Sequence, residues 1–206
     1  MVFTPSPAET EILDLTAKER HTFVLRSYVG TPDRTGTLIE FTLKLPPCRQ
    51  AVYYRGQWWP YGGNRVFGER LNKASKEGGI FSIVELSRGD YLAILPLCGE
   101  QAYAWFAPQD GCLSLRVGTR GTVRVNGDLP VVAWARAASP YEAGARVWEQ
   151  AAQTDQIKGW MKMRQEKPYP EMFAYLGWCS WEEFKKNISS KSLVGVFEEL
   201  EANELP

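Results

Sequence analysis

The feature that most constrains this fold is a series of short β-strand patterns separated by turn residues. Residues 39–45 alternate apolar and polar side chains with a period of two, which predicts a strand with one buried and one solvent-facing side. Further runs with strand character lie at residues 51–54, 79–86, 91–95, 102–106, 113–117, 122–125 and 131–134. Many short strands punctuated in this way indicate a mainly β chain that forms an antiparallel β-sandwich.

Three of the segments between these runs contain residue types that adopt a positive φ at little energetic cost. They are Arg88-Gly89-Asp90, Gln109-Asp110-Gly111 and Asn126-Gly127-Asp128. The last of them suits a two-residue hairpin turn. The first is also an Arg-Gly-Asp triplet of the kind used in adhesion, but without a secretion signal a hairpin turn is the favoured interpretation.

Composition and charge exclude several classes of protein. With 44% hydrophobic and 13% aromatic residues among 206 positions, the chain is expected to fold around a sizeable core. The 24 Lys and Arg residues balance 24 Asp and Glu residues, so neither nucleic acid nor an anionic membrane is an expected partner. The absence of an 18-residue apolar window and of a leader-like start predicts a cytoplasmic protein.

The cysteines and the histidine do not form a metal-binding pattern. Cys48, Cys98, Cys112 and Cys179 are widely spaced without a CxxC pair, and His21 is the one histidine in the sequence. We therefore expect reduced structural thiols, with no metal site and no cofactor.

The pattern changes from strand to helix after residue 138. Ser139 and Pro140 can cap and open a helix, in which Ala143, Val147 and Ala151 recur at four-residue spacing. The Lys-Pro-Tyr-Pro sequence at residues 167–170 ends the helical tendency. The chain is therefore expected to comprise a β-sandwich domain at 1–138, a helical linker at 139–170 and a further segment at 171–206.

This further segment is predicted to form one strand followed by one helix. Residues 173–181 are an apolar run too short for an ordinary buried helix, so a fully buried strand is expected. Ser189 or Ser190 can cap the next helix, which places Leu193, Phe197 and Leu200 on one face. One βα unit cannot bury both faces of its strand, so residues 171–206 are expected to begin a barrel that this sequence does not complete.

Residues 175–184, whose sequence is YLGWCSWEEF, resemble a motif of a known family. The string is similar to the Gly-Trp-Cys-Thr-Trp-Asp-x-Phe stretch that opens the catalytic barrel of raffinose synthases, seed-imbibition-type proteins and related family 36 α-galactosidases. Weaker similarities lie at residues 58–60, 91–97 and 139–141. The chain departs from the pattern at Ser180, where the family often has Thr, and at Glu182, where plant-type members have Asp.

The resemblance implies a fold and an activity. In that family a supersandwich-like β domain precedes a (β/α)₈ barrel, and the motif is the barrel's first strand and helix. The implied activity is on α-galactosides, by hydrolysis or by galactosyl transfer, with a galactose-containing oligosaccharide as ligand. Retaining glycosidases need two carboxylates about 5–5.5 Å apart. The family supplies both from later barrel strands, so residues 1–206 are expected to be inert without the rest of the barrel.

The resemblance implies five candidate sugar contacts and no catalytic residue in this sequence. Trp181, the second tryptophan of the motif, is expected to wall a galactose pocket with its indole face, with packing inside the barrel as the alternative. Cys179 and Glu182 adjoin it in sequence. Trp58 and Trp59 lie in a predicted loop from which one can reach the active site, or they pack at the edge of the sandwich.

Two other functions fit the same residues. One is a non-catalytic carbohydrate-binding β-sandwich that uses Trp58 and Trp59 as its platform. The other is an assembly module that forms a homo-oligomer, because an unfinished barrel strand exposes backbone hydrogen-bonding groups. Sugar binding by residues 1–138 favours the first, and sugar-independent self-association favours the second.

Overall fold

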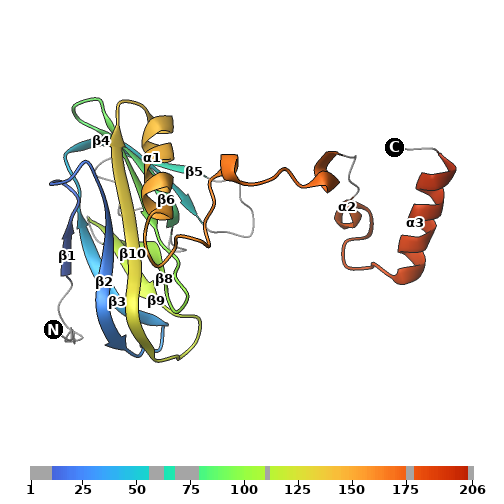
Figure 1. Ribbon diagram of the computed structural model, residues 1–206, viewed down its shortest axis with the longest axis horizontal. Helices are drawn as coiled ribbons and strands as arrows, with labels where there is room; N and C mark the ends of the chain where they lie inside the picture. Colours follow the sequence, from blue (N-terminus) through green and yellow to red (C-terminus); the bar gives the residue numbers. More distant parts are fainter. Residues whose placement is uncertain (1–10, 56–62, 68–78, 110–111, 175–178, 204–206) are drawn as a thin grey trace. The chain divides into compact units, whose positions relative to one another are not determined.

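The computed structural model describes residues 11–55, 63–67, 79–109, 112–174 and 179–203. The chain divides into two compact units, Met1–Met163 and Arg164–Pro206, called here the first and the second unit. All described strands and helix α1 belong to the first unit, whereas helices α2 and α3 belong to the second (Figure 1).

The described strands of the first unit form one mixed sheet. Its described strands are β1 (Glu11–Asp14), β2 (Arg20–Gly30), β3 (Thr37–Lys44), β4 (Cys48–Arg55), β5 (Gly63–Phe67), β6 (Gly79–Leu86), β7 (Tyr91–Pro96), β8 (Tyr103–Gln109), β9 (Cys112–Gly118) and β10 (Val125–Ala137). The strand order is β1-β3-β9-β8-β6-β7-β10-β2, and β4 pairs with both β5 and β6. The β1–β3 pair is parallel and the other described pairs are antiparallel.

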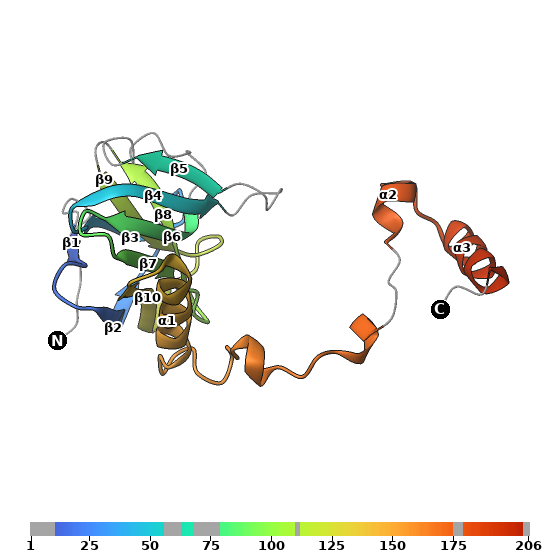
Figure 2. The ribbon, with the colours of Figure 1, turned by 90° about the horizontal axis from the view of Figure 1, so that it is seen from above.

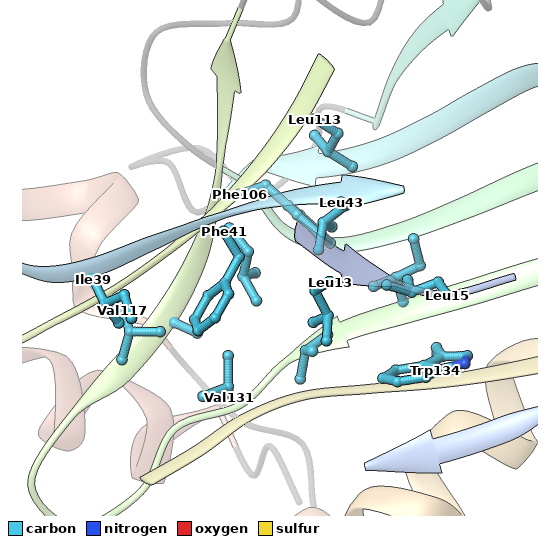
Figure 3. Packing of buried hydrophobic residues seen from close by; sticks show 14 of the residues in the cluster. Leu13, Leu15, Ile39, Phe41, Leu43, Phe106, Leu113, Val117, Val131 and Trp134 are labelled. Carbon is cyan, nitrogen blue, oxygen red and sulfur yellow. The ribbon is translucent and has the colours of Figure 1, made fainter. Parts of the chain in front are cut away.

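The sheet curls around a hydrophobic core, which confirms the mainly β, sandwich-like fold. Phe41 of β3 and Phe106 of β8 are each 1% exposed, and Trp134 of β10 is 2% exposed. Figure 3 shows side chains of β1, β3, β8 and β9 directed toward those of β10 across this core. Alternate residues of these strands point inward, as the period-two pattern predicts.

Helix α1 (Pro140–Ala152) covers the outer face of β7 and β10 (Figure 2). This face is formed largely by alanines, with Ala93, Ala133 and Ala135 fully buried beneath the helix. Small side chains on the sheet and at the helix positions 143, 147 and 151 let the two backbones approach closely. The predicted cap is confirmed, because the Ser139 hydroxyl accepts a hydrogen bond from the Glu142 backbone N–H at 3.2 Å.

The predicted strands at 39–45, 51–54, 79–86, 91–95, 102–106 and 113–117 are confirmed to within a few residues, and the run at 131–134 lies inside the longer strand β10. β1, β2 and β5 are additional strands that the sequence patterns did not identify. The turn predicted at 88–90 is confirmed, with Gly89 at a φ of 93° and its N–H bonded to the Leu86 carbonyl. Beside the separator at 109–111, Gln109 pairs with Cys112, while residues 110 and 111 lie outside the described residues.

The hairpin turn predicted at 126–128 is wrong, as is the separate strand at 122–125. Residues 122–124 belong to a loop, and β10 runs without a break from Val125, with a bulge beside Asp128 where its register with β2 shifts. Gly127 has a φ of 143° and pairs with Tyr28 of β2, and the preceding residue of β2, Ser27, has a φ of 50°. The Asp128 carboxylate accepts hydrogen bonds from the Ser27 N–H at 2.8 Å and from Arg26 at 2.5 Å. A glycine with positive φ suits a bulge as well as a turn, so the local pattern was ambiguous.

The second unit contains two short 3-10 helices, Arg164–Glu166 and Glu171–Ala174, and the helices α2 (Ser180–Phe184) and α3 (Ser190–Ala202). Helix α3 begins at a capping box in which Ser189 and Ser192 exchange hydrogen bonds, as the predicted Ser189 cap requires. None of the residues from 164 to 203 whose side chains the structure describes is buried.

The strand predicted at 173–181 is wrong at both of its ends. Residue 174 ends a 3-10 helix, and Ser180 and Trp181 begin α2, while residues 175–178 lie outside the described residues. A strand needs neighbours that accept its backbone hydrogen bonds, and all described strands lie within residues 11–137. Over the described part of the chain, no helix has the length and apolarity to cross a membrane.

Candidate functional site

The motif residues lie at the start of helix α2. Cys179 is the residue that precedes the helix, and its exposed side chain makes no capping hydrogen bond. Trp181 lies in the first turn and is 47% exposed. The Trp181 carbonyl accepts a hydrogen bond from the Lys185 N–H at 3.0 Å, where the chain leaves the helix at a φ of 52°. Trp181 therefore presents much of its indole to solvent from a helix, and not from the end of a strand as predicted.

Among the other predicted contacts, the structure describes the side chain of Cys179 but not those of the remaining three. Glu182 is part of α2, but its side chain is not among the described ones. Trp58 and Trp59 lie outside the described residues. Cys48, Cys98 and Cys179 are free thiols, and the described residues contain no cluster of three metal-ligating side chains.

The first unit has an open groove that the sequence analysis did not identify. Its volume is about 650 Å³, and its walls are the β7–β8 and β9–β10 connections. Residues whose side chains give the groove its chemistry are Cys98, Glu100, Tyr103, Arg120, Val123 and Arg124. These are a thiol, a hydroxyl-bearing ring, an exposed apolar side chain, one carboxylate and two guanidinium groups. We call this feature the loop groove.

Backbone and side-chain hydrogen bonds tie the two walls of the loop groove together. Gln101 donates from Nε2 to the Asn126 carbonyl at 3.1 Å and accepts from the Asn126 N–H at 2.9 Å. Within the first wall, the Gly99 N–H bonds to the Ala102 carbonyl at 2.9 Å. In the second wall, the Thr119 hydroxyl donates to the Gly121 carbonyl at 2.5 Å. The backbone of the groove is therefore largely formed before any ligand arrives.

An aromatic pair extends from the loop groove along strand β8. The rings of Tyr103 and Trp105 have centroids 5.1 Å apart and planes inclined by 35°. Ala104 and Phe106 point into the core, so Tyr103 and Trp105 occupy the outer face of the strand. On β9, a Cβ at Gly118 would lie 2.8 Å from Trp105 Cη2, so glycine there allows the indole to lie close to the backbone.

A charged pair lies beside this aromatic pair on the outer face. Arg116 is opposite Trp105 in the sheet, and its Nε donates to Glu40 Oε2 at 2.9 Å. Glu40 Oε1 is buried and has no hydrogen-bond partner among the described residues. The outer face of β3, β9 and β8 thus combines aromatic surface with groups that donate and accept hydrogen bonds.

A smaller hollow of about 140 Å³ adjoins the loop groove and shares residues 99–102 with it. Asp128 and Gln156 line it from the opposite side, with a 3.3 Å hydrogen bond between them. Hydrogen bonds from the Ser27 N–H and from Arg26 hold the pKa of the Asp128 carboxyl below its usual value. These hydrogen bonds join β2 to β10 at the bulge, so the Asp128 carboxylate has a structural role.

The sequence offered little indication of the loop groove. Residues 102–106 were recognised as a strand, but the aromatic character of alternate positions 103 and 105 is common in buried strands too. Arg120 and Arg124 lie in a segment whose end was expected to be a strand. Only the pairing of the sheet brings the connection at 97–102 beside that at 119–124.

Comparison with known proteins identifies solved α-galactosidase structures of low similarity. No protein-family model matches the chain, and no curated protein matches it. The α-galactosidase TtGalA of Thermus thermophilus in complex with stachyose has 16% identity and a TM-score of 0.36, over 88% of this chain and 38% of that one. TtGalA in complex with p-nitrophenyl α-D-galactopyranoside has 15% identity and a TM-score of 0.35, over 88% and 36%. The chain thus spans well under half of those proteins, and similarity of this degree assigns it no function.

Proposed function

We propose that this chain is the amino-terminal part of a carbohydrate-active enzyme that acts on α-galactosides. The observation that carries the proposal is the YLGWCSWEEF string at residues 175–184, which follows a β unit and a helix in the order known for family 36 enzymes. In this proposal residues 1–138 are the sandwich domain, 139–170 the linker and 171–206 the start of the catalytic barrel. A cytoplasmic location stays a prediction.

Trp181 is the proposed galactose contact. Galactose presents an apolar patch of C–H bonds on one side of its ring, and the face of an indole complements that patch. The half-exposed Trp181 side chain is available for such a contact. Cys179, Glu182 and one of Trp58 and Trp59 are proposed to complete the wall of the pocket.

Apolar side chains of helix α3 are exposed, which supports the proposal that further parts of the enzyme pack against the second unit. Val194 and Phe197 of α3 are 54% and 57% exposed, although their side chains are apolar. Burying such side chains is favourable at roughly 1.5–3 kcal/mol each. We therefore propose that the remaining barrel strands and helices cover this unit in the complete enzyme.

The proposed chemistry is retaining glycosyl transfer. One carboxylate attacks the anomeric carbon while a second protonates the leaving oxygen, and the acceptor is then water or a second sugar. By the family resemblance both carboxylates come from later barrel strands, so the 206-residue chain is expected to show no turnover. The choice between water and sugar depends on residues of those later strands.

Expression of the complete reading frame from the source genome tests this proposal. The product should hydrolyse p-nitrophenyl α-D-galactopyranoside in preference to the β-galactoside and the α-glucoside, and residues 1–206 alone should not. A Trp181→Ala change should lower kcat/KM by about tenfold or more, because it removes a stacked contact. Trp160→Ala, at a tryptophan that is 78% exposed, is the matched control and should leave kcat/KM unchanged.

The proposal is wrong if the complete product has no activity on α-galactosides. It is also wrong if the reading frame stops after residue 206 and the chain forms no active complex. In that case a non-catalytic role comes first, and the loop groove favours binding of a ligand over assembly of a homo-oligomer.

A further inference from the structure

We propose that the loop groove and the Tyr103–Trp105 pair form a binding site for a neutral oligosaccharide. This site uses none of residues 175–184, so it does not depend on the enzymatic proposal above. It also differs from the platform that the sequence predicted, because Trp58 and Trp59 take no part in it.

The aromatic pair supplies the apolar part of such a site. Tyr103 is 38% exposed, and its ring both lies beside that of Trp105 and lines the loop groove. The C–H groups of a pyranose ring carry partial positive charge and are attracted to the negative face of an aromatic ring. A sugar ring stacked on Tyr103 would therefore lie at the mouth of the groove.

The walls supply polar groups that match the hydroxyls of a sugar. Each hydroxyl can donate one hydrogen bond and accept others, so its site needs both kinds of partner. Glu100 accepts, whereas Arg120 and Arg124 donate from planar groups suited to neighbouring hydroxyls. Val123, at 58% exposed, adds an apolar contact to the groove.

The size and rigidity of the groove fit a ligand of this class. Its volume of about 650 Å³ lies within the range of roughly 300–1,000 Å³ that is usual for small-molecule sites. The Gln101–Asn126 hydrogen bonds hold the two walls together, so binding does not have to order them. Glu100 offsets one of the two arginine charges, so the groove carries little of the excess positive charge that a polyanion site needs.

This inference is tested by titrating the 206-residue chain with stachyose, maltotetraose and cellotetraose. Calorimetry and tryptophan fluorescence measure the binding. At least one tetrasaccharide should bind with a Kd on the order of 1 mM. Tyr103→Ala should weaken that binding by about tenfold, and Tyr103→Phe should retain it because the ring remains. Tyr141→Ala, at an 89% exposed tyrosine on α1, is the matched control and should leave binding unchanged.

Thiol alkylation locates the bound sugar within the same chain. Cys98 lines the loop groove and is exposed, while Cys179 is exposed in the second unit. A saturating tetrasaccharide should slow alkylation of Cys98 by about threefold or more, measured on its peptide by mass spectrometry, and leave Cys179 unaffected. Protection of Cys179 in place of Cys98 would overturn this inference and support sugar binding at the motif.

Three other results would also overturn the inference. They are the failure of all three tetrasaccharides to bind, an unchanged Kd in a folded Tyr103→Ala variant, and binding of inorganic phosphate at the groove in the absence of any sugar binding. Unfolding temperatures of the variants, measured alongside, establish that they are folded. None of these results bears on α-galactosidase activity of the complete reading frame, so the two proposals fail separately.

Discussion

The two units of this chain have similar apolar side chains but very different surroundings for them. In the first unit, β7 and β10 are buried on both faces, by the core on one side and by helix α1 on the other. In the second unit, none of the side chains described between residues 164 and 203 is buried, although α3 carries Leu193 and Phe197 at helical spacing. Amphipathic pattern alone therefore does not make a core, because burial needs a second apolar surface.

The largest expected effect is the difference in stability loss between truncating a phenylalanine of the first unit and truncating one of the second unit. Phe41→Ala removes a side chain that is 1% exposed and should lower the free energy of unfolding by about 3–5 kcal/mol. Phe197→Ala makes the same change at a 57% exposed position and should alter it by less than about 0.5 kcal/mol. Urea unfolding followed by fluorescence measures both, and equal losses would show that the second unit has a core of its own.

A smaller effect is expected where helix α1 meets the sheet. Ala143→Leu forces a larger side chain between α1 and the outer face of β7 and β10, and should cost about 1–3 kcal/mol. Ala145→Leu places the same side chain on the exposed side of the helix and is the control. Thermal unfolding of the two variants compares them, and identical midpoints would mean that the helix is not held tightly against the sheet.

Removing the capping serine of one helix in each unit is expected to affect unfolding differently in the two units. Ser139→Ala and Ser189→Ala each remove an N-cap, and a typical loss is about 1 kcal/mol of helix stability. Because α1 is part of the first unit's core, Ser139→Ala should lower the midpoint of cooperative unfolding. Ser189→Ala should reduce helical circular dichroism while that midpoint stays constant. A shift of the midpoint in both variants would show that the units unfold together.

The smallest effect concerns an exposed carboxylate on the edge strand β1. Hydrogen bonds from Lys44 and Thr16 lower the pKa of Asp14 from 3.8 to about 2. Since the folded-state pKa is the lower one, this interaction stabilises the fold above pH 3.8 and is lost as the pH falls toward 2. Lys44→Ala should raise the Asp14 pKa toward its ordinary value, which carboxyl NMR titration measures. An unchanged pKa would contradict the role assigned to Lys44.

The strands and helices of the first unit were largely predictable, and the loop groove was not. The period-two run at 39–45 and the alanine and valine spacing at 143, 147 and 151 depend on neighbouring residues within one element. The groove depends on two pairs of residues, Cys98 with Tyr103 and Arg120 with Arg124, and these pairs come from separate loops. No pattern within either loop indicates that the other lies beside it.

What the sequence by itself determined is the local structure, because caps, turns and face-alternation need only near neighbours. The cap at Ser139, the turn at Gly89 and the inward face of β3 are of this kind. The tertiary structure alone decided the parallel β1–β3 pairing, the bulge at Asp128 and the helical ends of the run at 173–181. Each of these depends on which distant backbone supplies a hydrogen bond or a buried surface, and that choice is made by the whole fold.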